Sequence, residues 1–245
     1  MTLAEEQLAA WNEPDGVNPR GTLVVIPGRG EGPSVYERFG RRLAADAYRV
    51  RVVTDPVANE ALAARQAIAE LVDCAAPGPW VLVGSDTGAL LAAGLVASGR
   101  LTDVDALVLA GLPTAAERDA GSWDDELDDR TSCPTHRGRL TASGLRRGAL
   151  YEPVPGRWLE RAELSAITQP ILGIHGGEDQ VSPLAQARAR YAAAPAAELV
   201  VITGGRHDAL NDQTHRTVAA TIVLFLERLR LGQDLPPIAL SDRRQ

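Results

Sequence analysis

Six short apolar runs alternate with longer segments of helical periodicity. This alternation constrains the fold of the chain more than any other feature of its sequence. The apolar runs occupy residues 22–28, 49–55, 80–84, 105–113, 170–177 and 198–205. The segments of helical periodicity are 34–48, 58–72, 87–99, 184–194 and 215–232. Strands that are apolar throughout and separated by helices are typical of a parallel sheet covered on both faces. The sequence therefore predicts an α/β fold with a mostly parallel, doubly wound sheet.

The length of the chain and one charged interruption set the expected domain organisation. With 245 residues, the chain is expected to form a single domain, residues 1–245. Residues 116–165 interrupt the alternation between the fourth and fifth apolar runs. This segment is charged and has no continuous apolar stripe, so we expect a short, solvated cap or lid inserted into the domain.

Composition excludes several classes of function. The formal net charge is −7, which argues against a protein that binds nucleic acid through a basic surface. The chain contains no lysine, so neither Schiff-base catalysis nor a phosphate-binding loop with a lysine is available. No apolar run reaches 18 residues and no leader-like start is evident, so we expect a cytoplasmic protein without a membrane span. The expected partner is a small-molecule substrate, with a homodimer as an option.

Polar residues follow three of the predicted strands. In a parallel sheet, ligands bind outside the carboxyl ends of the strands. "GSDTG" follows the third strand and places Asp86 between two glycines, in a pattern similar to the G-x-S-x-G turn that carries a nucleophile. "GGEDQVSP" places Asp179 after the fifth strand, and "GGRHDALND" places His207 after the sixth. We therefore expect Asp86, Asp179 and His207 to converge from three loops.

These motifs resemble those of the α/β-hydrolase superfamily, and the resemblance extends over residues 20–232. The order nucleophile, acid, histidine is matched by Asp86, Asp179 and His207. The stretch "PGRGEGPSVYERFGRRLAADAYRV" is similar to the H-G-x-G-E-H segment of the lysophospholipase and monoglyceride-lipase branch. The resemblance implies an oxyanion hole formed by the backbone N–H groups of Arg29 and Thr87. The chain departs from the family in having Pro27 in place of a histidine and Asp86 in place of the nucleophilic serine.

An aspartate at the elbow changes the chemistry that is expected. A carboxylate that attacks an ester carbonyl forms an energetically unfavourable anhydride, whereas a carboxylate that attacks a saturated carbon forms an alkyl ester. Water activated by His207 can hydrolyse that ester while Asp179 holds the imidazole. This route resembles that of haloalkane dehalogenases and epoxide hydrolases. We therefore expect a hydrolase that acts on a small, largely apolar substrate, with Asp86 ionised at the N-terminus of the following helix.

Other readings of the same residues remain open at this stage. Asp86 could serve as an acid, a base or an electrostatic group in a lyase, cyclase or isomerase. The chain could also be an esterase-like member whose elbow serine has been replaced, with Ser85 or water supporting weak hydrolysis. A third reading is a binding protein without catalytic activity.

Candidate substrate-binding residues are scattered along the sequence. The inserted segment concentrates polar and aromatic side chains, and the start of the last helix adds a histidine. The full set is Gly28, Trp123, Cys133, His136, Arg137, Tyr151, Trp158 and His215. The four histidines and the two cysteines, Cys74 and Cys133, lack the spacing of metal ligands, so we expect neither a metal nor a cofactor.

Overall fold

A single sheet organises the computed structural model, which describes residues 8–72, 78–115, 117 and 119–240. Within these residues, seven strands follow the order β1-β3-β2-β4-β5-β6-β7 across the sheet. Their bounds are β1 Ala9–Trp11, β2 Gly21–Ile26, β3 Tyr48–Val52, β4 Trp80–Ser85, β5 Ala106–Ala110, β6 Ile171–Gly176 and β7 Ala197–Ile202. All neighbouring strands from β3 to β7 are parallel, which confirms the predicted α/β sheet.

The edge strand β1 was not expected from the sequence. It spans three residues and pairs antiparallel with β3, so that Ala10 lies opposite Arg51. A strand this short carries too little alternation of apolar and polar residues to be recognised. All six predicted strands are present.

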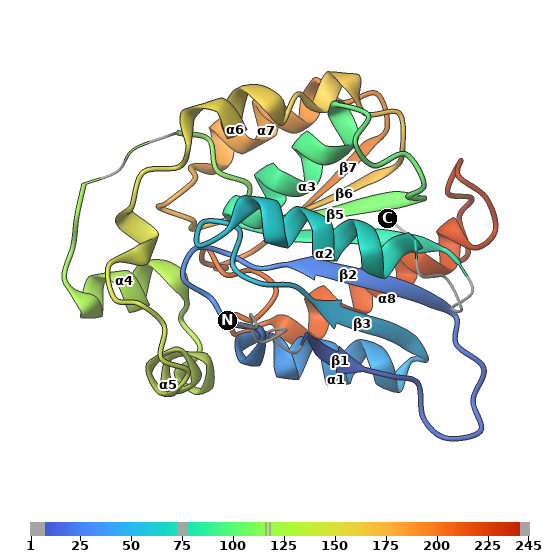
Figure 1. Cartoon of the computed structure of the whole chain (residues 1–245), viewed down its shortest axis with the longest axis horizontal. Helices are drawn as coiled ribbons and strands as arrows, with labels where there is room; N and C mark the ends of the chain where they lie inside the picture. The colour runs from blue at the N-terminus through green and yellow to red at the C-terminus, as the bar shows by residue number, and fades with distance from the viewer. Residues whose placement is uncertain (1–7, 73–77, 116, 118, 241–245) are drawn as a thin grey trace, which may run out of the picture.

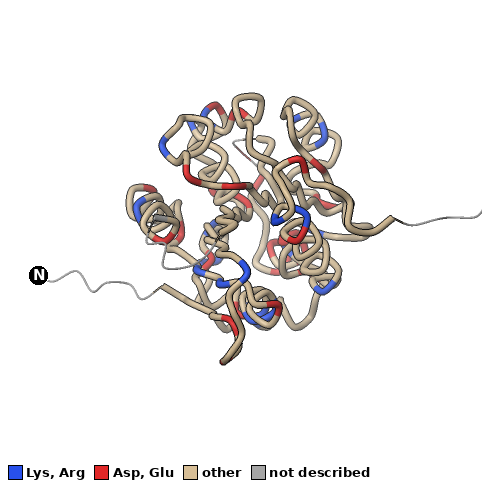
Figure 2. Tube along the Cα trace, turned by 90° about the vertical axis from the view of Figure 1, so that its right-hand side faces the viewer, with Lys and Arg blue, Asp and Glu red and all other residues tan. Residues whose placement is uncertain are grey.

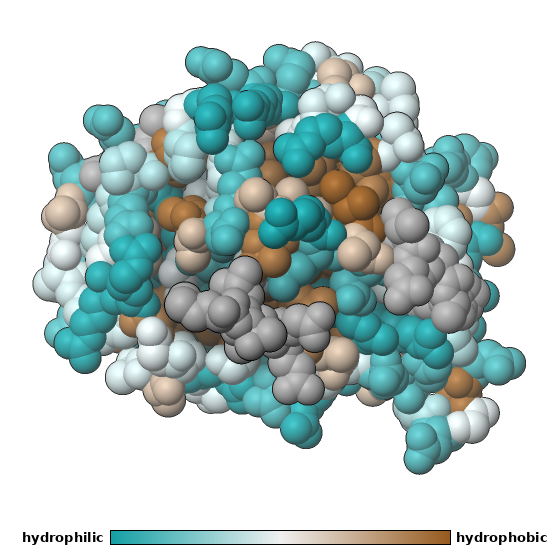
Figure 3. Space-filling model, in the orientation of Figure 1, coloured by the Kyte–Doolittle hydropathy of each residue, from teal (hydrophilic) through white to brown (hydrophobic). Residues whose placement is uncertain are grey.

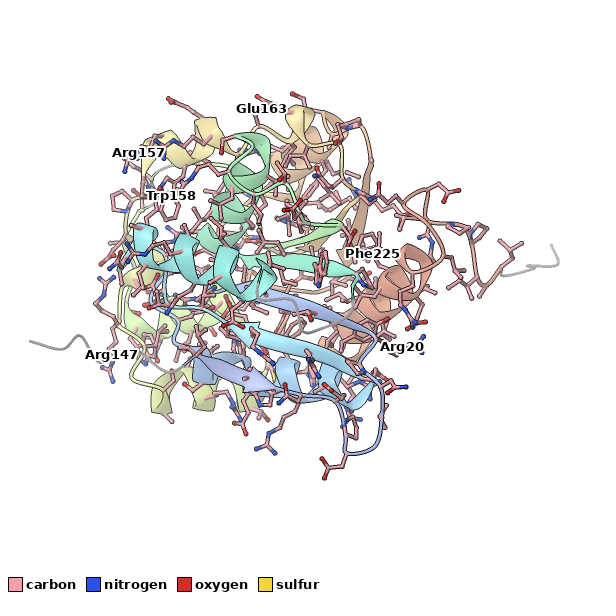
Figure 4. All side chains as sticks on the ribbon, turned by 45° about the vertical axis from the view of Figure 1, so that its right-hand side comes forward. Arg20, Arg147, Arg157, Trp158, Glu163 and Phe225 are labelled. Atoms are coloured by element: carbon pink, nitrogen blue, oxygen red, sulfur yellow. The ribbon has the colours of Figure 1, made fainter. Side chains whose placement is uncertain are left out.

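Helices cover both faces of the sheet (Figure 1). Their bounds are η1 Pro33–Tyr36, α1 Glu37–Ala45, α2 Glu60–Val72, α3 Thr87–Ala97, α7 Leu184–Ala192 and α8 His215–Leu229. The buried side chains form two clusters, one between the sheet and α1 and α8, the other between the sheet and α2, α3 and α7. Phe225 on α8 belongs to the first cluster (Figure 4). Each face of the sheet thus has its own core, as expected for strands that are apolar throughout.

The register of the strands brings the loops of interest together. Ile26 of β2 pairs with Gly84 of β4, so the chain that follows each strand emerges at the same edge. On the other side, Gly176 of β6 pairs with Ile202 of β7. The loops after β2, β4, β6 and β7 are therefore neighbours at the carboxyl edge of the sheet.

The inserted segment folds differently from the solvated lid that was expected. It contains α4 Trp123–Arg130, α5 Pro134–Ala142, η2 Ala149–Tyr151 and α6 Gly156–Arg161, followed by η3 Leu164–Ala166. Ser122 and Asp125 form a capping box that starts α4. The segment completely buries Leu140, Leu150 and the charged Arg130. It is therefore more closely packed than its polar composition indicates. In Figure 1, α4 and α5 stand beyond the carboxyl ends of the strands.

Two further features bear on function. Among the described helices, none has the length and apolar character needed to cross a bilayer. Acidic and basic residues are interspersed along the chain rather than gathered by sign (Figure 2). Cys74 lies outside the described residues.

Candidate active site

The turn between β4 and α3 lifts Asp86 away from the sheet. The backbone of Asp86 has φ 48° and ψ −123°, a conformation that L-residues rarely adopt. Small neighbours make the turn feasible, because a Cβ on Gly88 would lie 2.1 Å from the carbonyl oxygen of Ile26. Asp86 occupies the N-cap position of α3, yet its side chain makes no capping hydrogen bond. The carboxylate is instead available to groups on other loops.

Asp86, His207 and Asp179 form a chain of hydrogen bonds. His207 Nε2 lies 3.2 Å from Asp86 Oδ1, and His207 Nδ1 lies 2.9 Å from Asp179 Oδ2. Asp179 is itself fixed, because its Oδ1 accepts hydrogen bonds from the backbone N–H groups of Val181 and Ser182. The three residues that were singled out from the sequence are thus adjacent in the structure, in the order expected for a triad.

His175, which precedes Asp179, has a supporting position. Its Nε2 lies 2.7 Å from the carbonyl oxygen of Ser182 and 3.3 Å from Asp179 Oδ2. It is completely buried, and these contacts of its side chain are with Ser182 and Asp179 rather than with Asp86. The side chain therefore packs behind the acid of the triad.

The side chain of Arg29 is the functional group that sequence reasoning missed. Its Nε and Nη2 donate to the two oxygens of Asp86, each at 2.8 Å, and its backbone N–H donates to Asp86 Oδ2 at 3.0 Å. Its Nη1 donates to the carbonyl oxygen of Glu152 at 2.7 Å. Arg29 is 4% exposed and Asp86 is 1% exposed, so this is a buried, bidentate ion pair. The resemblance assigned a role only to the backbone of Arg29, although a buried carboxylate in a chain without lysine needs an arginine or a histidine as partner.

The paired charges set the protonation states of the site. Burial opposes ionisation of Asp86, but the adjacent Arg29 guanidinium and His207 hold the pKa of Asp86 well below its usual range. Burial likewise opposes the charge on His207, but the carboxylates of Asp179 and Asp86 raise the pKa of His207 to about 10. At neutral pH the site therefore contains two cations and two anions. The direction of this shift agrees with the sequence-based expectation of an ionised Asp86, and Arg29 and His207 are the groups that lower its pKa.

A second buried network joins the inserted segment to the loops of the candidate site. Arg130 at the end of α4 donates to Glu31 Oε1 at 3.0 Å and to the carbonyl oxygen of Arg29 at 2.9 Å. It also binds Glu126 at 3.2 Å and lies 3.5 Å from Asp208. Burial and the Asp208 carboxylate raise the pKa of Glu31 to about 8, although Arg130 opposes this shift. Arg130 thus connects α4 with the loops that carry Arg29 and His207.

Two of the other predicted residues lie beside the site. A Cβ on Gly28 would lie 3.1 Å from Cβ of Asp86, and the Gly28 N–H donates to Glu31 and to the hydroxyl of Tyr36. Thr87 is buried, and its hydroxyl lies 3.5 Å from Asp86 Oδ2. His136 is one step further away, because its Nε2 lies 3.0 Å from Asp208 Oδ2.

The remaining candidates have their contacts elsewhere. The recorded contacts join Trp123 to Arg147, Cys133 to Arg38, Arg137 to Asp128, Tyr151 to Asp129, Trp158 to Glu60, and His215 to the carbonyl oxygen of Asp212. Figure 4 shows Trp158 beside Arg157 on α6, and Trp158 is 3% exposed and belongs to the buried cluster that includes α3. None of these contacts involves Asp86, Arg29 or His207, and a role in substrate binding stays a prediction for them.

Cavities flank the site without reaching the triad. One of about 320 Å³ is lined by Gly30 and Glu31, on the loop that carries Arg29, and by Asp55, which follows β3. Another of about 240 Å³ is lined by Leu90, Leu91 and Trp158, where apolar residues gather near α3 and α6 (Figure 3). Asp86 and His207 line neither of these two cavities, and each is 1% exposed, so the candidate site is closed to solvent in this structure. Among the described residues, no three His, Cys, Asp or Glu side chains are grouped to hold a metal ion.

Comparison with known proteins supports the fold. No protein-family model and no curated sequence matches the chain. Among solved structures, a soluble variant of monoglyceride lipase from Saccharomyces cerevisiae is 17% identical, with a TM-score of 0.74 and 91% of each chain covered. A monoacylglycerol lipase from Paleococcus ferrophilus is 14% identical, with a TM-score of 0.74 and coverage of 92% of this chain and 98% of that one. An esterase from Rhodococcus sp. is 18% identical, with a TM-score of 0.70 and coverage of 91% and 95%. The chain therefore has the α/β-hydrolase fold, in the form that these lipases and esterases share.

Proposed function

We propose that this chain is a hydrolase that uses the Asp86 carboxylate to form an ester with a saturated carbon of a small substrate. Water activated by His207 then hydrolyses the ester. The observation that carries the proposal is a carboxylate on the strained turn after β4, within 3.2 Å of a histidine that is held by a second carboxylate. The fold shared with lipases and esterases supports hydrolysis as the reaction type.

The first step uses the ionised Asp86. Its low pKa keeps the carboxylate charged at neutral pH, and an oxygen that is released from Arg29 or His207 can then act as the nucleophile. Attack on a saturated carbon expels a leaving group and yields a stable alkyl ester. Attack on an ester carbonyl would instead yield an anhydride, so we expect displacement of a leaving group at a saturated carbon in preference to ordinary ester hydrolysis.

Formation of the ester prepares His207 for the second step. In the resting site His207 is protonated, because two carboxylates raise its pKa to about 10. The ester carries no charge, so one of these two carboxylates is lost and the pKa of His207 falls. The imidazole can then release its proton and act as a general base towards water, while Asp179 continues to hold Nδ1.

The same groups can stabilise the tetrahedral intermediate on the Asp86 carboxyl carbon. The backbone N–H of Arg29 already donates to Asp86 Oδ2, the oxygen on which negative charge would develop. The backbone N–H of Thr87, the first residue of α3, would be the second donor of the oxyanion hole. Arg29 therefore has one role through its backbone and another through its side chain.

The intermediate can be trapped in a His207→Gln variant, in which alkylation can occur but hydrolysis is slow. The variant would be incubated with 2-halocarboxylates, haloalkanes and epoxides, and its peptides analysed by mass spectrometry. We expect the peptide that contains Asp86 to gain the mass of the substrate minus its leaving group. The matched control is Asp86→Asn/His207→Gln, which should remain unmodified. Turnover by the wild-type enzyme without an adduct on Asp86 in the variant would exclude the covalent route.

One observation favours a second candidate function, a binding protein without catalysis. Both oxygens of Asp86 are occupied by Arg29 and His207, and the site is closed. A purely structural ion pair would have the same appearance. In that case no substrate class would be turned over, and ligand binding would be unaffected by Asp86→Asn.

A further inference from the structure

We infer that the substrate carries a carboxylate directly bonded to the reacting carbon, and that this carboxylate replaces Asp86 on the Arg29 guanidinium when the aspartyl ester forms. This inference rests on the proposed function and names the substrate class of the same site. It departs from the largely apolar substrate expected from the sequence. The charge balance of the closed site, in which Arg29 and Asp86 form a buried ion pair, supports it.

Arg29 depends on Asp86 for its negative partner. Within the described part of the chain, Asp86 provides the only carboxylate within 4.0 Å of the guanidinium that the structure records. The remaining donor, Nη1, is directed at the neutral carbonyl oxygen of Glu152. Glu31, the nearest acid along the chain, is instead bound by Arg130 and Tyr36.

Ester formation removes this partner. The resting site is neutral, with Arg29 and His207 opposite Asp86 and Asp179. Once Asp86 is esterified, one negative charge is gone. His207 can respond by losing a proton, but an arginine guanidinium keeps its charge at any pH at which proteins are folded. A neutral substrate would therefore leave a buried, unpaired cation, which is strongly unfavourable.

A substrate carboxylate restores the balance. The planar guanidinium fork matches a carboxylate in bidentate geometry, which is how it already binds Asp86. With a substrate carboxylate on this fork, the carbon directly bonded to it is the substrate carbon nearest to the displaced Asp86 oxygen. The substrate anion thus offsets the lost charge and positions the reacting carbon at the same time.

The reaction balances as a substitution followed by hydrolysis. An Asp86 oxygen forms a bond to carbon 2 of a 2-halocarboxylate, and the carbon–halogen bond breaks with both electrons leaving on the halide. Water then adds to the carboxyl carbon of Asp86, and His207 accepts its proton. The bond between the Asp86 carboxyl carbon and the ester oxygen then breaks, and the 2-hydroxycarboxylate departs with the oxygen that Asp86 supplied and with the second proton of the water. Asp86 regains its charge and His207 its resting proton, and the proton that His207 released on ester formation leaves to solvent with the halide.

Two substrates of nearly equal shape test the inference, namely 2-chloropropionate and 2-chloropropionamide. The amide has no charge and is intrinsically no worse an electrophile. We expect kcat/KM for chloride release to be about 100-fold or more higher for the carboxylate, since the amide leaves Arg29 unpaired. Arg29→Met should abolish this preference, whereas Arg65→Gln, a change at an exposed arginine on α2, should retain it.

The outcomes separate the inference from the proposed function. If the amide alkylates Asp86 as fast as the carboxylate does, the inference is wrong and the covalent mechanism stands. If neither compound nor any neutral halide or epoxide modifies Asp86, both are wrong. A preference that survives Arg29→Met would also overturn the inference, because another group would then bind the anion.

A second measurement needs no turnover. The Asp86→Gly variant keeps a residue compatible with the positive φ of the turn and leaves Arg29 without its carboxylate. We expect sodium propionate to raise the Tm of this variant by several degrees above the effect of sodium chloride at equal ionic strength. Propionamide should have no such effect, and Asp86→Gly/Arg29→Met should not respond. Equal effects of propionate and chloride on Asp86→Gly would contradict the proposed exchange of anions.

Discussion

The ion pair between Arg29 and Asp86 predicts a large coupling energy. Both side chains are almost completely buried, and three N–H groups of Arg29 donate to Asp86 at 2.8–3.0 Å. Removing one partner of such a pair leaves an uncompensated buried charge, so we expect Arg29→Met and Asp86→Asn each to lower the free energy of unfolding by about 3 kcal/mol. The double variant removes both charges and should cost about 2 to 3 kcal/mol less than the sum of the single changes.

Urea denaturation followed by tryptophan fluorescence can measure this cycle, since the chain has four tryptophans. Asn is suited to the positive φ at position 86, so Asp86→Asn tests charge with little backbone strain. The slopes of the transitions should be similar for all four proteins if only native stability changes. Additive costs, with a coupling below about 0.5 kcal/mol, would mean that Arg29 and Asp86 do not form a buried pair in solution.

Three other predictions follow from the same geometry. Gly88→Ala should lower the free energy of unfolding by more than about 2 kcal/mol in urea, because its Cβ would overlap the backbone of Ile26. Gly138→Ala, at an exposed position of α5 with open space around its Cβ, should be neutral or stabilising. The folded-state pKa of His207 is about 10, above its ordinary 6.5, so its contribution to stability is complete below pH 6.5 and lost as the pH rises through 10. Stability should therefore fall more steeply from pH 7 to 10 in the wild type than in His207→Gln. Asp86→Ser should hydrolyse p-nitrophenyl acetate at least about tenfold faster than Asp86→Ala, and equal rates would mean that no oxyanion hole forms.

Local patterns in the sequence predicted the strands and helices of the parallel sheet. Strands such as β2 and β4 are apolar at nearly every position because both of their faces are covered, and this pattern is recognisable without knowledge of the partners. The packing of the inserted segment could not be predicted in this way. Its helix α4 buries Glu126 and Arg130, whose opposite charges pair with each other, whereas charged residues are by composition expected to be exposed to solvent.

The candidate site likewise has a part that the sequence predicted and a part that it did not. Asp86, Asp179 and His207 follow the ends of strands, so topology alone brings them to one edge of the sheet. The contact of the Arg29 side chain with Asp86 depends on a rotamer and on the carbonyl oxygen of Glu152, from a distant part of the chain. The signal available in the sequence was indirect: a buried aspartate requires a cationic partner, and "GRG" supplies an arginine next to the predicted oxyanion loop.

A single turnover in ¹⁸O-labelled water tests the central claim most directly. The enzyme would be in excess over 2-chloropropionate, and both the product and the Asp86 peptide would be analysed by mass spectrometry. The account predicts that the new hydroxyl of 2-hydroxypropionate is unlabelled, because its oxygen comes from Asp86, and that Asp86 gains one ¹⁸O. A labelled hydroxyl on the product with an unlabelled Asp86 would mean that water attacks the substrate directly, and would contradict the aspartyl ester.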